Sequence, residues 1–600
     1  MDPRDPNIVY SGCFGGSISR YDVRTGQTRE ILAYPQNQLA QRVGDLRYRF
    51  QWNAPIRLSP HNPDVLYHTS QYVHRSTDGG QSWQTISPDL TTDNDAYHDI
   101  PGGPIQHDHT GVELYTTIFA FEESPHTPGE LWAGTDDGRV HLSRDDGATW
   151  TEITPRQMPA EGTVNTIDLS KHTPGRAFLA VYKYRENDFR PYLFRTDDYG
   201  QSWELLTDGA NGIPADHFTR VVREDPDRKG LLYAGTEFGL YVSFDDGAHW
   251  QPLQLNLPVT PVTDLAVHEQ DLVVATQGRS FWILDDLTPL HQLTDAVAAA
   301  EAHLFAPRPA YRTQMRGFRG GNAPEPRPNG ALIYFYLAEK PDTAAAVTLE
   351  FLDAGQQVVR TFSTKPDEEK KEGTLTLKAG LNRFVWDLNH PAPDLVEGAV
   401  MSLAYTGGPK AMTGPYHARL TAGTHTQTQP FEIKKDPRWA YTDADLQAQF
   451  DLTMAVLGKL NETHEAIRTI RSVREQTKTL AGRAVKAGHA EVVKTAAREI
   501  GEKLTALEHK LIQTRSESSQ DPINFPSMID DQFAYLYTVV NAQDARPSAG
   551  AYERFDDLKA ELQPHLDTLQ SILTTDVATF NALLAQEGVP HIVLPVGNGQ

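Results

Sequence analysis

The sequence predicts a mainly β fold, in which a β-propeller is followed by a β-sandwich and a C-terminal α-helical bundle. Three observations predict it. An octapeptide with turn residues at fixed positions occurs four times in the first 250 residues, alternating strand patterns begin near residue 332, and a helical periodicity begins near residue 442. The predicted boundaries are 1–300 for the propeller, 301–330 for a linker, 331–436 for the sandwich and 437–600 for the helices.

The octapeptide has the form [ST]-x-D-x-G-x-x-W and begins at Ser76, Ser143, Thr196 and Ser243. It predicts a tight turn between the third and fourth strands of a small antiparallel sheet. Its Asp can accept hydrogen bonds from turn amides, its Gly can take a positive φ, and its Trp can clamp the following strand onto the sheet. We therefore predict a structural role for Asp78, Gly80, Trp83, Asp145, Gly147, Trp150, Asp198, Gly200, Trp203, Asp245, Gly247 and Trp250.

A second repeat precedes each octapeptide: a turn, usually with proline, followed by a short apolar run that begins a strand. Together with the run 272–285, which has no octapeptide, these repeats predict about six four-stranded units between residues 1 and 290. The first unit lacks its first strand. We interpret the propeller as an N-terminally truncated fragment of a longer parent; in the alternative, residues 302–305 close the ring.

The second half of the chain changes its pattern twice. Residues 332–433 contain seven short alternating runs separated by turn signals, which predicts a small immunoglobulin-like β-sandwich. After Pro437 the composition becomes helical, and Thr442 can cap a helix whose first turn carries Asp443 and Asp445. Further helices are predicted over 490–513, 527–541 and 551–586, making a helical hairpin or bundle. Arg468, Arg471 and Arg474 are interpreted as a solvated face of the first helix.

The composition excludes several function classes. The chain has 55 Lys and Arg against 79 Asp and Glu, a formal net charge of −24, and no basic stretch, so we expect no nucleic-acid partner. The single cysteine, Cys13, excludes an intrachain disulfide framework and a multi-cysteine metal site. No apolar run is long enough for a membrane span, and the first residues lack the basic and apolar regions of a secretion signal.

One face of the predicted propeller collects the candidate functional residues. The connections into each first strand and the turns between second and third strands emerge there, opposite the octapeptide turns. Carboxylates, histidines, arginines and aromatic residues in these segments can bind a sugar chain, and two carboxylates can divide acid and base roles. The candidate catalytic residues are Asp45, Asp108, Glu113, Asp188 and Asp216. The candidate substrate-binding residues are Arg47, Arg49, Trp52, His107, His109, Phe189, Arg190, His217, Arg220 and Arg279.

Each candidate also has a structural interpretation. Asp45 can satisfy loop amides, Glu113 can pair with an arginine, and Trp52 and Phe189 can serve in packing. His107 and His109 could hold a metal, and the acidic loop 89–99 carries calcium-type ligands, but neither has a recognised metal-loop spacing. We therefore predict no metal, and since no phosphate-binding glycine pattern is present, no cofactor.

The stretches 212–226, 230–247 and 275–286, with 380–387 and 466–474, resemble a large bacterial family of BNR-repeat, sortilin-like proteins that are often labelled glycosyl hydrolases. The octapeptide resembles the Asp box of such propellers, and the resemblance covers nearly the whole chain. It implies a periplasmic or secreted protein with a longer N-terminal region. The residue set of a sialidase site does not map onto this chain. In xyloglucan-degrading propellers two aspartates face a cleft between two propellers, and only half of such a cleft could exist here.

Two functional hypotheses follow. In the first, the chain acts on or binds extracellular polysaccharide, as a glycoside hydrolase or the substrate-binding part of one. In the second, it is a noncatalytic, sortilin-like propeller that binds protein or peptide. The first predicts a cleft with two carboxylates and exposed aromatic residues, and the second predicts a flat or apolar mouth. The sequence predicts neither the substrate nor the oligomeric state.

Overall fold

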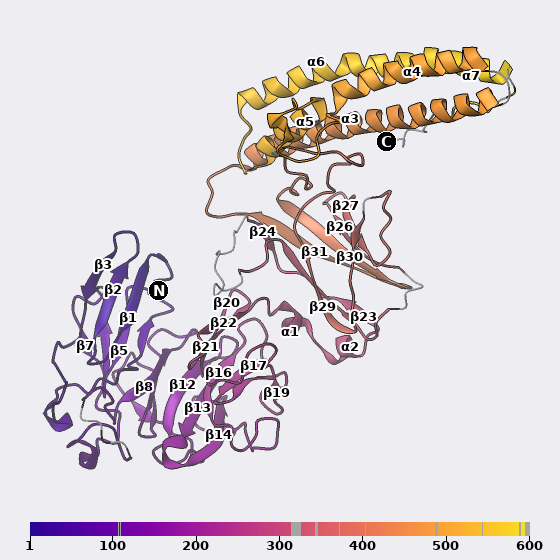
Figure 1. Cartoon of the computed structure of the whole chain (residues 1–600). Helices are drawn as coiled ribbons and strands as arrows, with labels where there is room; N and C mark the ends of the chain where they lie inside the picture. The colour runs from indigo at the N-terminus through magenta and orange to yellow at the C-terminus, as the bar shows by residue number, and fades with distance from the viewer. Residues whose placement is uncertain are drawn as a thin grey trace. The chain divides into compact units, whose positions relative to one another are not determined.

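The computed structural model describes all residues except 106, 108–109, 314–325, 342–345, 371, 403, 487–489, 543, 587, 589 and 595–600, and the side chains at 485, 486 and 490. The protein is mainly β, with many small sheets and a helical C-terminal region (Figure 1). It divides into two compact units, Met1–His291 and Gln292–Gln600. None of the described helices is both long and apolar enough to cross a membrane.

The first unit contains six antiparallel sheets in chain order, as predicted. Sheet 1 consists of β1 (Ile8–Gly12), β2 (Ile18–Asp22) and β3 (Gln27–Glu30), and sheet 2 of β4 (Ile56–Leu58), β5 (Leu66–Thr69), β6 (Val73–Ser76) and β7 (Gln84–Thr85). Sheet 3 consists of β8 (Ile118–Glu123), β9 (Leu131–Thr135), β10 (Val140–Ser143) and β11 (Thr151–Glu152). Sheet 4 consists of β12 (Thr163–Leu169), β13 (Ala177–Lys183), β14 (Asp188–Thr196) and β15 (Glu204–Leu205). Sheet 5 consists of β16 (Thr219–Glu224), β17 (Leu232–Thr236), β18 (Gly239–Ser243) and β19 (Gln251–Pro252), and sheet 6 of β20 (Val262–His268), β21 (Asp271–Thr276) and β22 (Phe281–Leu284).

The sheets are arranged as the blades of a β-propeller. Successive sheets pack side by side, and the first strands β4, β8, β12, β16 and β20 line a common channel. Short 3-10 helices occur at Val43–Asp45, Asp95–Tyr97 and Tyr184–Glu186, and the helix α1 (Thr288–Gln292) follows sheet 6. This arrangement directs loops from several sheets toward one mouth of the channel.

Each octapeptide forms a turn that is held by its own side chains. In the first, Gly80 N donates to Ser76 Oγ at 2.8 Å, and Asp78 accepts from the backbone N and the hydroxyl of Ser82 at 2.9 and 2.6 Å. The other three repeat this pattern around Asp145, Asp198 and Asp245. These hydrogen bonds, led by the one from Ser82, lower the pKa of Asp78 to about 2. The aspartates are therefore acceptors within their own turns.

The tryptophan of each octapeptide binds the preceding sheet, which corrects the expectation that it clamps its own sheet. Trp83 Nε1 donates to Ile31 O at 2.8 Å, and Trp250 Nε1 donates to Leu206 O at 3.2 Å. The acceptor is in every case the residue directly after the last strand of the preceding sheet, and the remaining two bonds are Trp150 to Ile86 and Trp203 to Ile153. A Cβ on Gly80 would lie 2.5 Å from Ile31 Cδ1, so only glycine lets the two sheets approach this closely.

Histidines join the sheets in the opposite direction, at the turns after the first strands. His61 Nε2 donates to Ser124 O at 2.8 Å, and the same contact joins His126 to Ser170 and His172 to Asp225. Each histidine belongs to a Ser-x-His sequence in which the serine Oγ accepts from the histidine N. Because the carbonyl lies in the next sheet, sheets 2, 3 and 4 are each joined to both neighbours by these two kinds of contact.

The range 301–330, predicted as a linker, contributes two strands to the second unit. β23 (Ala302–Leu304) pairs with β25, and β24 (Ala310–Arg312) pairs with β31. The alternative in which residues 302–305 close the ring of six sheets is therefore wrong. Among the described strands, β1 pairs only with β2 and β22 pairs only with β21, so neither edge of the six-sheet unit gains a strand from residues 302–305.

Two sheets form the β part of the second unit. One has the order β23, β25 (Ala331–Leu337), β29 (Gly380–Trp386). The other has the order β24, β31 (His425–Lys435), β30 (Gly414–Ala422), β26 (Val347–Leu352), β27 (Val358–Ser363), β28 (Gly373–Thr374). Their side chains share one apolar core, in which the fully buried Trp386 stacks on Phe351 at 4.3 Å between ring centroids. An immunoglobulin-like topology for these strands stays a prediction.

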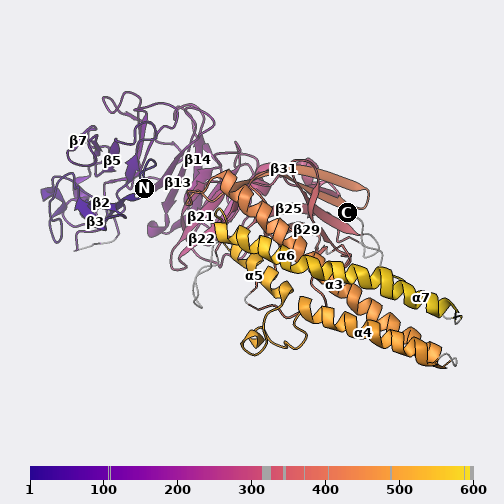
Figure 2. The ribbon, with the colours of Figure 1, turned by 90° about the horizontal axis from the view of Figure 1, so that it is seen from above.

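The C-terminal region is helical, as predicted. A short helix, α2 (Asp295–Ala298), precedes the two sheets, and the helices of the C-terminal region are α3 (Asp443–Lys486), α4 (Ala490–Leu511), α5 (Ile529–Asn541), α6 (Ala549–Ser571) and α7 (Val577–Gln586), with a 3-10 turn at Asp521–Ile523 and a π-helical segment at Ile572–Asp576. Thr442 caps α3, since its Oγ1 accepts from Asp445 N at 3.2 Å. Figure 2 shows α3, α4 and α6 running alongside one another.

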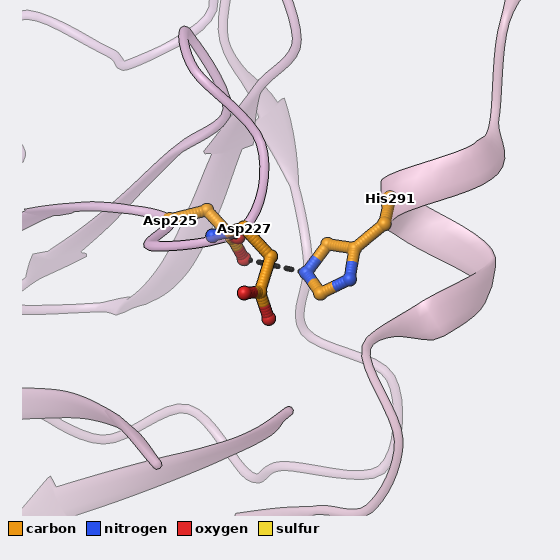
Figure 3. A group of neighbouring side chains, drawn as sticks. All are labelled: Asp225, Asp227 and His291. Atoms are coloured by element: carbon orange, nitrogen blue, oxygen red, sulfur yellow. Dashed lines mark hydrogen bonds and ion pairs between the residues drawn. The ribbon is translucent and has the colours of Figure 1, made fainter. Parts of the chain in front are cut away.

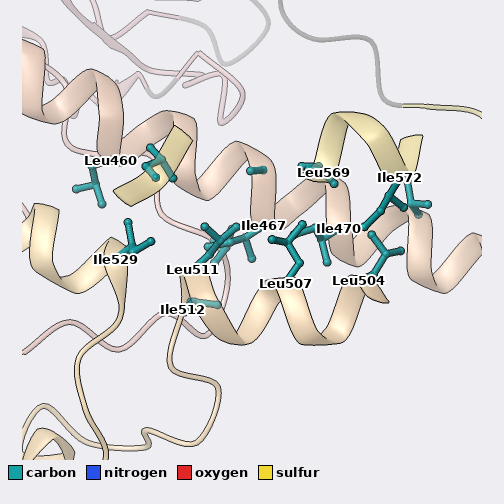
Figure 4. Close-up of a cluster of buried hydrophobic side chains, with 14 of the residues drawn as sticks. Leu460, Ile467, Ile470, Leu504, Leu507, Leu511, Ile512, Ile529, Leu569 and Ile572 are labelled. Atoms are coloured by element: carbon teal, nitrogen blue, oxygen red, sulfur yellow. The ribbon is translucent and has the colours of Figure 1, made fainter. Parts of the chain in front are cut away.

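The helices share one apolar core, and two of its arginines are not a solvated face. Ile467 and Ile470 of α3 lie against Leu511 and Leu507 of α4, and Leu460 of α3 lies beside Ile529 of α5 (Figure 4). At the edge of this core, Arg471 Nε lies 2.7 Å from Glu508 Oε1, and Arg474 pairs with Glu508 Oε2. Glu508 is only 3% exposed. The two arginines therefore neutralise a buried carboxylate of α4.

Candidate functional site

The central cavity of the first unit opens where the first strands meet, with a volume of about 490 Å³. Its lining comes from connections into first strands, from the first strands themselves and from turns between second and third strands. Trp52 and Glu113 belong to connections into first strands, and Arg185 belongs to a turn between a second and a third strand. The cavity is thus built from segments that the propeller arrangement gathers at one mouth.

The floor of the cavity is a ring of paired charges. Arg57 Nε lies 2.6 Å from Glu122 Oε1, while Arg223 lies 2.8 Å from Asp264 Oδ1 and 3.7 Å from Asp168 Oδ1. Below this ring is a second cavity of about 450 Å³. Burial raises the pKa of Asp168 to about 6, against the opposing effect of Arg223.

One wall of the cavity is lined by Tyr182, Tyr184 and Arg220, and further side chains that do not line the cavity pack against these residues. Glu237 Oε2 accepts from Nε and Nη2 of Arg220 at 2.9 and 2.7 Å. The guanidinium of Arg220 lies 5.1 Å from the ring of Phe218, which stacks on Tyr184 at 4.6 Å. Phe189, 43% exposed, lies beside Phe218. The wall offers flat apolar surface next to an oriented cation.

A small space of about 10 Å³ at one side of the cavity, called the junction below, is lined by two acidic residues. Glu113 and Asp136 both line it, with Tyr115 and Arg185. Asp136 is 3% exposed, and its Oδ1 and Oδ2 are each 2.8 Å from Thr117, from the backbone N and the hydroxyl respectively. Burial, followed by the nearby charge of Asp137, raises the pKa of Asp136 well above its usual range. Burial therefore favours the protonated form of Asp136, and the two hydrogen bonds from Thr117 oppose this by favouring the ionised form.

Three of the residues predicted from the sequence reach the cavity: Trp52, Glu113 and Arg220. Trp52 is 55% exposed, which leaves its ring available to a ligand. These three come from sheets 2, 3 and 5 or from the connections leading into them.

Arg47, Arg49 and Asp45 lie elsewhere. Arg49 is 6% exposed and forms ion pairs with Asp89 at 2.6 Å and Asp93 at 3.1 Å, so it neutralises the acidic loop. Arg47 lies over the ring of Tyr34 at 4.8 Å. Asp45 is exposed and lies 3.8 Å from Arg42. None of the three lines the central cavity.

The candidates from sheets 4, 5 and 6 form local pairs outside the cavity. Asp188 accepts from Arg190 at 2.6 and 2.9 Å, and this interaction lowers the pKa of Asp188 to about 2. Asp216 has a side chain that is 81% exposed, and His217 Nδ1 lies 2.9 Å from the hydroxyl of Tyr241. Of the sixth sheet's turn, Gln277 lines the cavity and the exposed Arg279 does not.

The His-Asp-His segment that was considered for a metal is described only at its first residue. His107 is exposed, and Asp108 and His109 lie outside the described residues. No statement about the position of these two side chains follows.

Sequence reasoning missed Asp136, Arg185 and Glu237. A signal for two of them exists, since Gly134-Thr135-Asp136 and Gly235-Thr236-Glu237 repeat at the end of a second strand. The acidic residue in this repeat begins the turn on the candidate face. Arg185 has no such repeat, because the turn between β13 and β14 is the 3-10 helix Tyr184–Glu186, which the corresponding turns of the other sheets lack.

Asp225, Asp227 and His291 form a second cluster at the turn of sheet 5 (Figure 3). Their potential ligand atoms lie within 4.8 Å of one another. Asp225 Oδ2 already accepts from His291 Nε2 and the hydroxyl of Tyr233, both at 2.8 Å, and Oδ1 accepts from the N of Asp227 and Arg228. Burial opposes ionisation here, but these hydrogen bonds outweigh it and lower the pKa of Asp225. We interpret the cluster as a clamp that holds α1 against sheet 5.

Comparisons with known proteins give one relative by sequence and several by structure. No protein-family model matches the chain. A xyloglucanase from Paenibacillus sp is 27% identical over 207 residues, which are 30% of this chain and 19% of that protein. The chain therefore spans about a fifth of the length of this curated relative.

Solved structures are similar at low TM-scores. The GH74 xyloglucanase from Xanthomonas campestris has a TM-score of 0.33 and 17% identity, over 47% of this chain and 44% of that one. The GH74 enzyme from Niastella koreensis has a TM-score of 0.33 and 12% identity, over 71% and 64%. YCF48 from Cyanidioschyzon merolae has a TM-score of 0.32 and 13% identity, over 46% and 79%.

Proposed function

We propose that the protein is a glycoside hydrolase-like propeller that binds a polysaccharide chain in the central cavity and cleaves it at the junction between Glu113 and Asp136. The observation that carries the proposal is that both acidic residues line the junction, next to a cavity wall that contains Tyr184 and Arg220. The sequence similarity to a xyloglucanase supports the same class of substrate.

The binding surface suits a sugar chain. Sugar rings present an apolar face to aromatic side chains and hydroxyls to charged or amide groups. The cavity offers Trp52 and Tyr184 for the first purpose, and Asn165 and Arg220 for the second. A concave polar mouth of this kind differs from the flat or apolar mouth that the peptide-binding alternative predicts.

The two carboxyl groups can divide the work of hydrolysis. Asp136, kept protonated by burial, donates its proton to the glycosidic oxygen as the bond from that oxygen to the anomeric carbon breaks. Glu113 either attacks the anomeric carbon or activates the water that does so. Water supplies the hydroxyl on that carbon, and its second proton returns the carboxyl pair to its starting state.

The first test is a hydrolysis and binding screen of the full chain against xyloglucan, other β-glucans and acidic polysaccharides. We expect hydrolysis that declines as the pH rises through the raised pKa of Asp136. Asp136→Asn and Glu113→Gln should each lower kcat by about 10²- to 10⁴-fold, while calorimetry still detects binding. Asp216→Asn, outside the cavity, is the matched control and should retain full activity.

Two results would count against the proposal. Full activity in both carboxyl variants would move the chemistry to other residues. Failure of the wild-type chain to bind or cleave any polysaccharide would instead favour the protein-binding alternative, which a peptide array can then test directly.

A further inference from the structure

In sheets 1 to 5, the last strand bonds to the strand before it in the same way. These last strands are β3, β7, β11, β15 and β19, and each is followed directly by an isoleucine or leucine. In sheet 3, the backbone N of Ile153 donates to Val140 O at 2.8 Å. The other bonds join Ile31 to Ile18, Ile86 to Val73, Leu206 to Leu193 and Leu253 to Leu240. In each of these sheets, the last strand therefore covers the outer edge of its neighbour.

A side chain beside this isoleucine or leucine completes the contact in four sheets. Thr154 Oγ1 accepts from Val140 N at 3.0 Å, and Ser87 Oγ accepts from Val73 N at 2.8 Å. Sheets 4 and 5 repeat the bond with Thr207 Oγ1 and Gln254 Oε1, both at 3.3 Å. A segment of the form [Ile/Leu]-[Ser/Thr/Gln] thus satisfies both backbone groups of one residue in the strand before it.

Sheet 6 ends at β22 without such a strand. Phe281 of β22 lies opposite Ala275 of β21, and the preceding turn is closed by Thr276 N donating to Ser280 O at 3.2 Å. Phe281 therefore takes the position of Val140, and alternation along the strand directs its backbone N and O away from β21. Among the described residues, only β21 pairs with β22, and no hydrogen bond to the backbone N or O of Phe281 is formed on the outer side.

The chain does not return along β22 after that strand ends. Asp286 N donates to Asp271 Oδ1 at 2.8 Å, and Leu287 N donates to Gln270 O at 2.7 Å. The segment after β22 therefore crosses to the turn between β20 and β21, and α1 begins directly afterwards. The outer edge of β22 is thus left uncovered by the segment that follows it.

Side-chain exposure distinguishes β22 from the equivalent strands. Phe281 is 77% exposed, and Ile283, two residues further on, is 60% exposed. At the position of Phe281, the other five sheets carry residues that are 0 to 3% exposed and lie in the core shared with the next sheet: Ile18, Val73, Val140, Leu193 and Leu240. An edge strand with free backbone groups and exposed apolar side chains is a template for a further strand.

We propose that β22 accepts a strand from another protein, which completes sheet 6. The donor is an extended segment of the form [Ile/Leu]-[Ser/Thr]. Its isoleucine or leucine N donates to Phe281 O, and its hydroxyl accepts from Phe281 N, as Ile153 and Thr154 do with Val140. The inference is independent of the proposed function, since no residue of β22 lines the central cavity.

The test uses a labelled synthetic peptide with the sequence of residues 149–155, which contains the last strand of sheet 3. Fluorescence anisotropy measures its binding to the full chain, and we expect saturable binding. N-methylation of the peptide isoleucine removes the bond to Phe281 O and should weaken binding about fivefold. Replacing the threonine after that isoleucine with valine removes the hydroxyl and should also weaken binding.

Ile283→Pro tests the edge in the chain itself. The N of Ile283 points to the same side as that of Phe281, so proline removes a donor from the outer edge and leaves the bonds to β21 intact. It should weaken peptide binding about tenfold without changing the unfolding temperature. Ile283→Thr keeps the N–H and the β-branched shape, and as the matched control it should bind within about twofold of the wild-type chain.

Three results would each overturn the proposal: no binding of the peptide to the wild-type chain, equal binding of the N-methylated peptide, or equal binding by a stable Ile283→Pro variant. If Ile283→Pro unfolds at a lower temperature, the N-methylated peptide on the wild-type chain decides. Analytical ultracentrifugation checks the source of the strand. A wild-type dimer that Ile283→Pro converts into a monomer would mean that a second copy covers this edge, and another protein is then the wrong occupant.

Discussion

The octapeptide turns and the central channel belong to the same six sheets, yet they use repetition differently. At the turns, four sheets repeat an aspartate that accepts from the backbone N four residues later, as Asp78 and Asp245 do. In the channel, the residues opposite Tyr67, Trp132, Phe178 and Tyr233 in the strand register are Arg57, Glu122, Asp168 and Arg223. A residue that recurs in every sheet serves the contact that every sheet makes. A residue that differs between equivalent positions is free to serve a task that occurs once.

The largest expected effect tests the turns. Trp250 is 3% exposed and donates to the preceding sheet, so Trp250→Ala should lower the free energy of unfolding by about 3–5 kcal/mol. Trp52→Ala, at a 55% exposed position, should change it by about 0.5 kcal/mol or less while weakening ligand binding. Urea unfolding followed by circular dichroism measures both. Equal losses of stability would break the distinction between turns and channel.

A smaller effect distinguishes the channel from the octapeptide turns: the contributions of their carboxyl groups to stability depend on pH in opposite directions. The pKa of the inner Asp168 is raised from 3.8 to about 6, so its contribution to stability is present below pH 3.8 and falls by up to about 2 kcal/mol as the pH rises through 6. Asp168→Asn should remove this dependence. The pKa of Asp78 is lowered to about 2, so its contribution has the opposite sign: it is present above pH 3.8 and is lost as the pH falls through 2.

Unfolding curves of Asp168→Asn and Asp78→Asn between pH 3 and pH 7 check this prediction. Relative to the wild-type chain, the Asp168 variant should gain stability at pH 7, and the Asp78 variant should lose it there. Parallel curves for the two variants would mean that inner and outer carboxylates do not differ in this way.

The smallest effect concerns the histidine contacts between sheets. His172→Ala removes one hydrogen bond to Asp225 O and should lower the free energy of unfolding by about 1 kcal/mol. His268→Ala, at an exposed position of β20, is the control and should be near neutral. If both variants are neutral, the tryptophan contacts alone hold adjacent sheets together.

Much of the fold could be predicted because it repeats. Four occurrences of one octapeptide fix where each sheet turns, and Thr442 marks the start of α3 within one residue. The Trp250 contact was assigned to its own sheet because its acceptor, Leu206, lies in the preceding sheet, and local sequence does not show which sheet a side chain reaches. The strand β24 was missed, and β23 was considered only as a segment that closes the ring, because strands of three residues carry too little alternation to show which sheet they join.

The site was predicted less completely than the fold. Trp52, Glu113 and Arg220 could be chosen because loops on one face converge in any propeller. Whether Arg49 faces the cavity or the acidic loop depends on a partner 40 residues away, Asp89, which spacing does not indicate. Asp136 was passed over because an aspartate in a turn is usually an ordinary acceptor, and the sequence does not show the burial and the neighbouring charge of Asp137 that raise its pKa.

The contacts between sheets have a consequence for how such a protein can change over generations. Each octapeptide glycine and tryptophan meets a residue of the same kind, Ile31, Ile86, Ile153 or Leu206, in the sheet before it. The contacts between adjacent sheets are therefore alike, so duplication or loss of one of these sheets brings together the same types of residue as before. Sheet number can vary by recombination between repeats, while the mouth of the channel, where most equivalent positions carry different residues, has to be rebuilt one residue at a time.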